Sequence, residues 1–144
     1  MAIFYETVDI AFPKLKSRET TNWIKQVITT FNKTVGTITY IFCSDKEILR
    51  INLSYLQHDY YTDIITFDYS EGKKLSGDLF ISLDTVKSNS IKYRTKFDEE
   101  LQRVMIHGVL HLCGYDDKTP SEVLVMRKME NDALKLRKND TETQ

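Results

Sequence analysis

Few of the residues that mark specialised protein classes occur in this chain of 144 residues, which contains two cysteines, two prolines and five glycines. Cys43 and Cys113 lie within apolar segments and are too few for a disulfide framework, so we expect a reducing compartment. A formal net charge of −1 provides no overall attraction to nucleic acid or to a membrane. Any affinity for a polyanion must therefore come from a local cluster of charges.

Long apolar segments are also missing. No uninterrupted apolar run approaches the roughly 20 residues that a transmembrane helix needs. The N-terminal segment 1–10 has no basic stretch, and Glu6 and Asp9 interrupt its apolar residues, which is unlike a signal peptide. We therefore expect a cytoplasmic protein without a membrane partner.

The apolar pattern predicts one α+β domain. Apolar and β-branched residues predict strands over 2–12, 37–43, 63–67 and 78–82. Apolar residues at helical spacing predict helices over 17–32, 44–55, 97–112 and 120–138, and a short helix after Asp84. We expect a single domain over 1–138, a mixed sheet of about four strands with helices packed on it, and a disordered tail over 139–144. The third and fourth strands form either a hairpin or two neighbours in one sheet.

Two of the three histidines, His107 and His111, are four residues apart in the predicted helix 97–112. This spacing places both imidazoles on one helical face, with Cβ atoms about 5–6 Å apart, close enough to share one metal ion. A bare pair of this kind is more often two histidines that hydrogen-bond to carbonyl groups. The following residues favour a metal, because Gly114 permits a left-handed turn that brings Asp117 back toward the pair.

The sequence thus predicts a metal site at the later helices, with His107, His111 and Asp117 at three tetrahedral positions. A fourth position left to water is typical of a catalytic zinc site, so we expect one Zn²⁺ per chain, with other divalent ions as alternatives. Cys113 lies on another side of the helix and is interpreted as a core thiol. Gly108 stands where peptidases of the His-Glu-x-x-His type carry their general base, so proteolysis by that mechanism is excluded.

A basic stretch precedes the histidine helix. Tyr93 is interleaved with the cations of segment 85–97, which has no acidic residue and contains Lys87, Lys92, Arg94 and Lys96. Four such charges are common on any solvated surface, which explains them without a ligand. The alternative interpretation is an RNA-binding patch, in which the cations bind phosphates and an aromatic ring stacks on a base.

The segment 107–117, His-Gly-Val-Leu-His-Leu-Cys-Gly-Tyr-Asp-Asp, resembles the signature of the YbeY family of metal-dependent endoribonucleases. Other parts of 45–117 resemble further motifs of that family: Asn52, Tyr55, Asp59, Thr62 to Phe67, Gly77 to Ser82, and Glu100-Leu101. The resemblance implies cleavage of single-stranded RNA in ribosomal RNA maturation and ribosome quality control. It also implies ribosomal RNA and the small ribosomal subunit as partners, and a mixed sheet with the metal near the later helices.

Two positions depart from the family's pattern. The family commonly has a third histidine where this chain has Asp117. A carboxylate ligand neutralises part of the charge of the ion, which makes bound water less acidic and harder metals more competitive. The family often has an arginine at the position of Leu56, which serves the RNA phosphate. Arg50, Arg103 and His58 are the candidate replacements.

The resemblance leads us to assign catalytic roles to Asp63, Asp116 and Arg103, with the two carboxyl groups as candidates for orienting a ligand or transferring a proton. Two other functions fit the same ligands. One is a metal-dependent hydrolase of a small molecule or peptide, and the other is a non-catalytic assembly factor that binds RNA or the ribosome and keeps a structural metal. The sequence does not predict the oligomeric state.

Overall fold

The computed structural model describes residues 2–56 and 62–142, with side chains described for residues 2–55 and 62–138. It confirms the predicted α+β class, a mixed sheet of four strands with helices packed on it. In chain order the elements are β1 (Ala2–Thr7), α1 (Ser17–Thr30), β2 (Thr34–Cys43), α2 (Asp45–Ile51), the π-helical turn η1 (Asn52–Leu56), β3 (Ile64–Asp68), β4 (Lys74–Ser82), α3 (Leu83–Lys92), α4 (Phe97–Leu112) and α5 (Pro120–Glu142). Among the described residues, no helix has both the length and the apolar character needed to cross a membrane.

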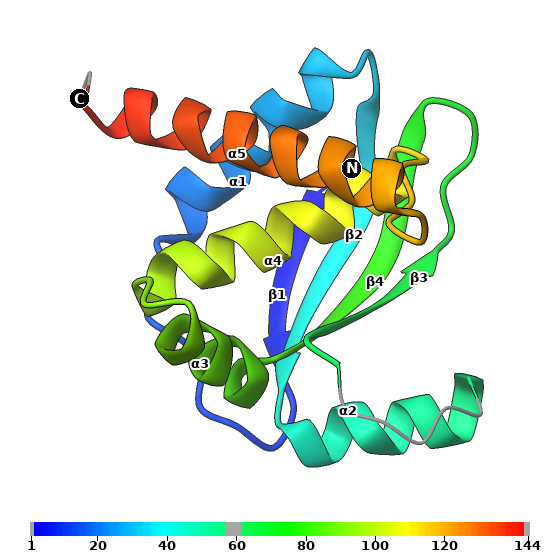
Figure 1. Cartoon of the computed structure of the whole chain (residues 1–144). Helices are drawn as coiled ribbons and strands as arrows, with labels where there is room; N and C mark the ends of the chain where they lie inside the picture. Colours follow the sequence, from blue (N-terminus) through cyan, green and yellow to red (C-terminus); the bar gives the residue numbers. More distant parts are fainter. Residues whose placement is uncertain (1, 57–61, 143–144) are drawn as a thin grey trace.

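The strand order in the sheet is β1-β2-β4-β3 (Figure 1). The strands β1, β2 and β4 are parallel, whereas β3 pairs antiparallel with β4. Of the two arrangements open from the sequence, β3 and β4 therefore form a hairpin, closed by the loop over 69–73. The parallel pairs require helical crossovers, and α1 supplies the one between β1 and β2.

Successive side chains of a strand point to opposite faces of the sheet. Both faces of this sheet carry apolar side chains, and helices cover both of them. Leu79 and Ile81 of β4 belong to the main core, which also includes buried residues of α1, α4 and α5. Phe80, between them, packs against a smaller core made with α2, in which Ile48 and Ile65 are buried. The histidine helix α4 thus lies over the sheet with the main core beneath it (Figure 1).

Several element boundaries differ from the sequence prediction, and β2 and β4 begin earlier than predicted, at Thr34 and Lys74. The first strand ends at Thr7 rather than near residue 12, because Asp9 adopts a left-handed φ of 56° that turns the chain away from β2. The helix predicted over 44–55 is divided into α2 and η1. Helix α5 continues through Glu142, so residues 139–142, which were predicted to be disordered, are helical. Neither Gly nor Pro follows Lys138, and so no residue there stops the helix.

Two contacts hold α4 close to the sheet. A Cβ atom at Gly108 would lie 2.8 Å from Cδ1 of Ile64 and 3.2 Å from Cδ2 of Leu79, so the absence of a side chain permits the close approach. The hydroxyl of Tyr40, a fully buried residue of β2, donates a hydrogen bond of 2.9 Å to the backbone oxygen of Met105. These contacts set the distance between α4 and the sheet, and with it the position of the two histidines.

The Tyr40 hydrogen bond leads to a test of this arrangement. We expect Tyr40→Phe to lower the free energy of unfolding by about 1 kcal/mol, the usual net contribution of a buried hydrogen bond. Urea denaturation measures this change. Tyr69→Phe is the matched control, because Tyr69 is 59% exposed, and it should leave the unfolding midpoint unchanged. Equal midpoints for Tyr40→Phe and wild type would show that the hydrogen bond does not hold α4 in place.

Candidate metal centre

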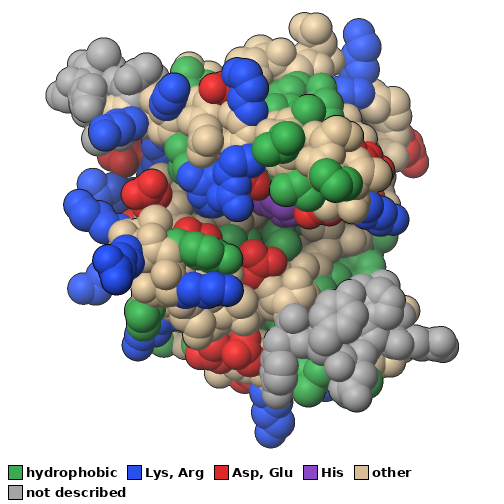
Figure 2. Space-filling model, in the orientation of Figure 1, with side chains coloured by type: hydrophobic (Ala, Val, Ile, Leu, Met, Phe, Trp, Pro, Cys, Tyr) green, Lys and Arg blue, Asp and Glu red, His purple; other side chains and the backbone are tan. Residues whose placement is uncertain are grey.

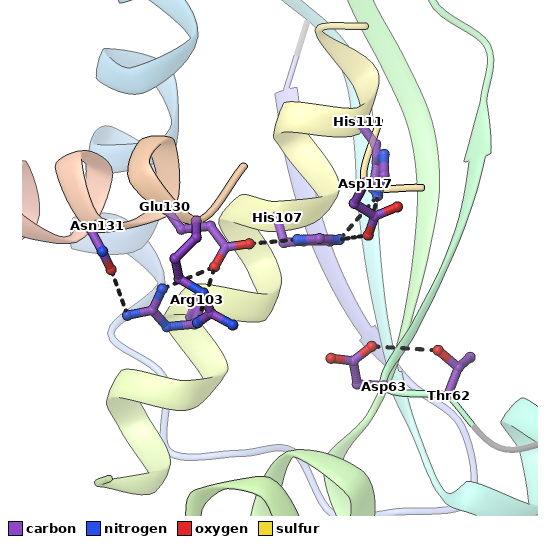
Figure 3. Close-up of polar contacts among 9 residues, drawn as sticks. Thr62, Asp63, Arg103, His107, His111, Asp117, Glu130 and Asn131 are labelled. Atoms are coloured by element: carbon purple, nitrogen blue, oxygen red, sulfur yellow. Dashed lines mark hydrogen bonds and ion pairs between the residues drawn. The ribbon is translucent and has the colours of Figure 1, made fainter. Parts of the chain in front are cut away.

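Three side chains converge at the end of α4. Nε2 of His107 lies 3.0 Å from Nε2 of His111 and 3.1 Å from Oδ2 of Asp117, and the distance from His111 Nε2 to the same oxygen is 3.6 Å (Figure 3). Tetrahedral coordination with metal–ligand bonds of about 2.0–2.1 Å separates ligand atoms by about 3.3 Å. The three atoms therefore match the edges of a tetrahedral site. Among the described residues, these three are the group whose donor atoms lie within 4.8 Å of one another and suit a metal.

The turn after α4 brings Asp117 to the histidines, as predicted. Gly114 has a φ of 104°, and its N–H donates to the backbone oxygen of His111 at 2.9 Å. The N–H of Tyr115 donates to the backbone oxygen of Leu110 at 3.1 Å. These two bonds form a Schellman motif, which requires a left-handed residue at the position of the glycine. The chain direction reverses there, and Asp117 faces back toward the helix.

A residue that the sequence analysis missed, Glu130 of α5, holds His107 from the other side (Figure 3). Nδ1 of His107 lies 2.6 Å from Oε2 of Glu130, which is 4% exposed. An N–H at Nδ1 donates to this carboxylate, so the lone pair of Nε2 faces Asp117 and His111. A carboxylate that fixes the tautomer of a histidine in this way is a recurring feature of metal sites. Helical spacing was the sequence signal for Glu130. It follows Met126, an apolar residue of the predicted helix 120–138, by four residues and so lies on the same face of that helix.

Arg103 in turn holds Glu130. Its Nη1 donates to Oε1 of Glu130 at 2.9 Å, and its Nη2 donates to Oδ1 of Asn131, also at 2.9 Å. The guanidinium group is thus engaged on both sides and acts on the metal site through Glu130. Arg103, which the sequence analysis named as catalytic, is thus joined to the site through its hydrogen bond to Glu130 and does not lie among the three ligand atoms.

Charge and burial have opposite effects on the pKa of His107. Burial lowers the pKa of His107, but the hydrogen bond and charge of Glu130, together with Asp117 and Asp63, outweigh it and raise the pKa above its ordinary value. Burial raises the pKa of Glu130, but its hydrogen bonds with His107 and Arg103 outweigh that effect and lower it. The site without a metal therefore holds a proton on His107 to higher pH than a free histidine does. A metal must displace this proton, so binding weakens as the pH falls.

The two other candidate carboxyl groups occupy different environments. Asp63 lines a cavity of about 450 Å³ together with His107, Arg103 and Glu130. Burial raises the pKa of Asp63, although the charge of His107 partly opposes this. Asp116 is exposed and is not part of the ligand group, although it is adjacent to Asp117 in the chain.

The predicted RNA-binding cations are all exposed, in α3 and in the loop before α4: Lys87, Lys92, Arg94 and Lys96. Tyr93 and Thr95, which lie between them in sequence, line the same cavity as His107. Figure 2 shows a histidine in a hollow of this face, with Lys and Arg side chains gathered beside it.

The remaining sequence candidates are not placed at the centre. The guanidinium group of Arg50 is bonded to the carboxylate of Glu47 within α2, with Nε at 3.0 and 3.1 Å from the two oxygens. His58 lies outside the described residues. Cys113 is half-buried against the main core and is absent from the ligand group, and burial raises its pKa to about 11. Its place against the core and outside the ligand group agrees with its interpretation as a core residue.

Comparison with known proteins agrees with the motif around these ligands. The sequence profile described as Endoribonuclease YbeY matches residues 7–138. The chain belongs to the YbeY family. An Endoribonuclease YbeY of Bacteroides fragilis is 61% identical over 138 residues, which cover 96% of this chain and 99% of the relative. An Endoribonuclease YbeY of Bacteroides thetaiotaomicron is 56% identical, with 95% of this chain and 100% of the relative covered.

The fold of this chain is also seen in a solved structure. The solution structure of a Thermotoga maritima protein superposes with a TM-score of 0.68 and covers 98% of this chain and 92% of that chain. The two sequences are 22% identical, so the similarity supports the fold alone. The arrangement of sheet and helices is thus retained where most side chains differ.

The contact between His107 and Glu130 predicts an effect on metal affinity. We expect Glu130→Gln to raise the zinc dissociation constant about 10- to 100-fold, because loss of a carboxylate beside a ligating histidine has effects of that size. Competition with a chromophoric zinc chelator measures the constant.

Two further variants make this measurement decisive. Asp132→Asn, on the exposed side of α5 in an ion pair with Lys128, should bind zinc as wild type does. His111→Ala should no longer bind a near-stoichiometric amount of zinc, because the substitution removes a ligand. Wild-type affinity in Glu130→Gln would mean that His107 needs no partner, and equal zinc in His111→Ala and wild type would contradict the ligand set.

Proposed function

We propose that this protein is a zinc-dependent endoribonuclease of the cytoplasm. Its substrate is single-stranded ribosomal RNA, which it cuts during maturation and quality control of the small ribosomal subunit. The observation that carries the proposal is the convergence of His107, His111 and Asp117 on one tetrahedral site in a chain of the YbeY family. Two imidazoles favour zinc, and one carboxylate keeps harder divalent ions competitive.

The donor set determines what the centre can do. Among the residues that the structure describes, no protein group joins the three ligand atoms at the fourth tetrahedral position, and an open position distinguishes catalytic from structural zinc sites. When bound, the ion supplies Lewis-acid activation of a phosphodiester or of water. Within the chain, Glu130 keeps the proton of His107 on Nδ1, and Arg103 keeps Glu130 ionised and oriented. We therefore assign Arg103 a positioning role.

Proton transfer is assigned to Asp63. Burial raises the pKa of this carboxyl group, so it keeps its proton to higher pH than an exposed aspartate. It lines the same cavity as His107, where it can protonate the oxygen that leaves the phosphorus atom. Asp116 is exposed beside Asp117, and we propose that it contributes to the charge of the centre. The exposed cations Lys87, Lys92, Arg94 and Lys96 would guide the RNA backbone toward the cavity.

One observation favours a second candidate function. Leu56 stands where the family often has an arginine, and Arg50 and Arg103 are both bonded to carboxylates. A chain that binds RNA without stabilising the reacting phosphate would be an assembly factor with a structural metal.

Incubation with RNA separates the two functions. Zinc-loaded wild type should cut unstructured ribosomal RNA fragments faster than structured ones, and Asp117→Ala should lose cleavage because a ligand is removed. Asp132→Ala is the matched control, since it removes an exposed carboxylate that pairs with Lys128 and is not part of the ligand group, and it should retain the activity. Denaturing gels report the products.

The possible results assign the function. Binding of RNA without cleavage by wild type would support the assembly factor and contradict the nuclease. Cleavage that survives equally in Asp117→Ala would mean that the reaction occurs away from this centre.

A further inference from the structure

The cavity beside the metal centre is also lined by residues that have no part in holding the metal. Its lining includes His107, Asp63 and Glu130, which are drawn in Figure 3, together with Asn89 of α3 and Tyr93, the residue that follows α3. Arg127 of α5 completes the lining. With a volume of about 450 Å³, the cavity falls within the range of pockets that hold small organic ligands. It adjoins the ligand site, so one molecule can occupy both.

The two arginines of this cavity differ in what they can still bind. Arg103 has 18% of its side chain exposed and is hydrogen-bonded to Glu130 and Asn131. Arg127 has 60% of its side chain exposed, and its Nη1 lies 3.7 Å from Oε1 of Glu130, too long for a hydrogen bond. An incoming phosphate would have to break the bonds of Arg103, whereas it can bind the outer side of Arg127. Arg127 is therefore the arginine of this cavity that suits a phosphate.

The lining also includes an aromatic residue, Tyr93, whose backbone is fixed. Tyr93 is 59% exposed, and its N–H donates to the backbone oxygen of Asn89 at 2.9 Å. The next residue, Arg94, has a left-handed φ of 56°, and the N–H of Thr95 donates to the backbone oxygen of Ser90 at 2.9 Å. The backbone at the end of α3 is thus held by hydrogen bonds. Only the side chain of Tyr93 has to be ordered when a base stacks on it, which lowers the entropic cost of binding.

The ring has one face for a ligand. The ammonium group of Lys92 lies 5.3 Å from the ring centroid of Tyr93, which places a cation on one face. A base would stack on the other face. A cation near a stacked base and its phosphate also attracts the backbone of a single strand.

We propose that this cavity is a nucleotide subsite of single-stranded RNA, with the base stacked on Tyr93 and the neighbouring phosphate bound by Arg127, next to the phosphate held at the metal centre. The subsite rests on the proposed function, since it assumes that RNA enters the centre. It gives this chain a phosphate-binding arginine on α5, where Leu56 supplies none. A duplex does not fit the subsite, because its bases are stacked on one another and cannot also stack on the ring.

Binding and salt dependence test the subsite. Fluorescence anisotropy with a labelled, unstructured oligoribonucleotide measures the dissociation constant of the metal-free protein, so that the RNA stays intact. Tyr93→Leu should bind roughly 5- to 150-fold more weakly, the range expected for one stacked base, and Tyr93→Phe should bind as wild type does. Arg127→Gln should reduce the slope of log K against log salt concentration by about 0.7, the value for one phosphate contact on a single strand.

Matched controls come from the same chain. Tyr69→Leu removes a tyrosine that is also 59% exposed but lies outside this cavity. Lys128→Gln removes the neighbouring charge on α5, which pairs with Asp132 at 3.0 Å. Both controls should bind RNA with wild-type affinity and salt slope. If Tyr93→Leu matches Tyr69→Leu and Arg127→Gln matches Lys128→Gln, the subsite is wrong.

A cleavage assay of the metal-loaded proteins separates this failure from failure of the proposed function. Cleavage by wild type together with unchanged binding in both cavity variants would overturn the subsite alone. Selective loss of binding in these variants, without cleavage by wild type, would support the subsite and overturn the nuclease.

Discussion

The hydrogen bond between His107 and Glu130 is the interaction on which the metal centre depends. It joins α4 to α5 at 2.6 Å and places the lone pair of Nε2 toward the other two ligands. A buried carboxylate is costly unless it is paired and hydrogen-bonded, and Glu130 meets that condition by contacting His107 through one oxygen and Arg103 through the other. Removal of one member therefore leaves charged or polar groups of the others without a partner in a buried setting.

Charges of opposite sign lie in two regions near the hydrogen bond between His107 and Glu130. Glu130, Asp117 and Asp63 raise the proton affinity of His107 and favour a cation at the ligand atoms. Arg127 lines the same cavity, and the exposed cations of segment 87–96 belong to the part of the chain that contributes Tyr93 and Thr95 to its lining. Under the proposed function, a chain with a net charge of only −1 combines a site for a metal cation with a surface for a polyanion. Local placement of charge, rather than its total, determines the partners.

The sequence predicted those parts of the centre that depend on short spacing. His107 and His111 share a face because of the helical period, and Gly114 reverses the chain because glycine adopts a left-handed φ without strain. Glu130 was not predicted, because its contact joins residues 23 positions apart and arises only when α5 packs on α4. The hairpin of β3 and β4 was one of two arrangements open from the pattern, since alternation of side chains does not specify which strands are neighbours.

X-ray absorption at the zinc edge of the loaded protein tests the central claim, an open centre of two imidazoles and one carboxylate. The account predicts a first shell of nitrogen and oxygen at about 2.0–2.2 Å, with the scattering of two imidazole rings and no sulfur. A sulfur neighbour at about 2.3 Å would identify a cysteine as a ligand and contradict the ligand set. A first shell with a third imidazole would contradict it as well.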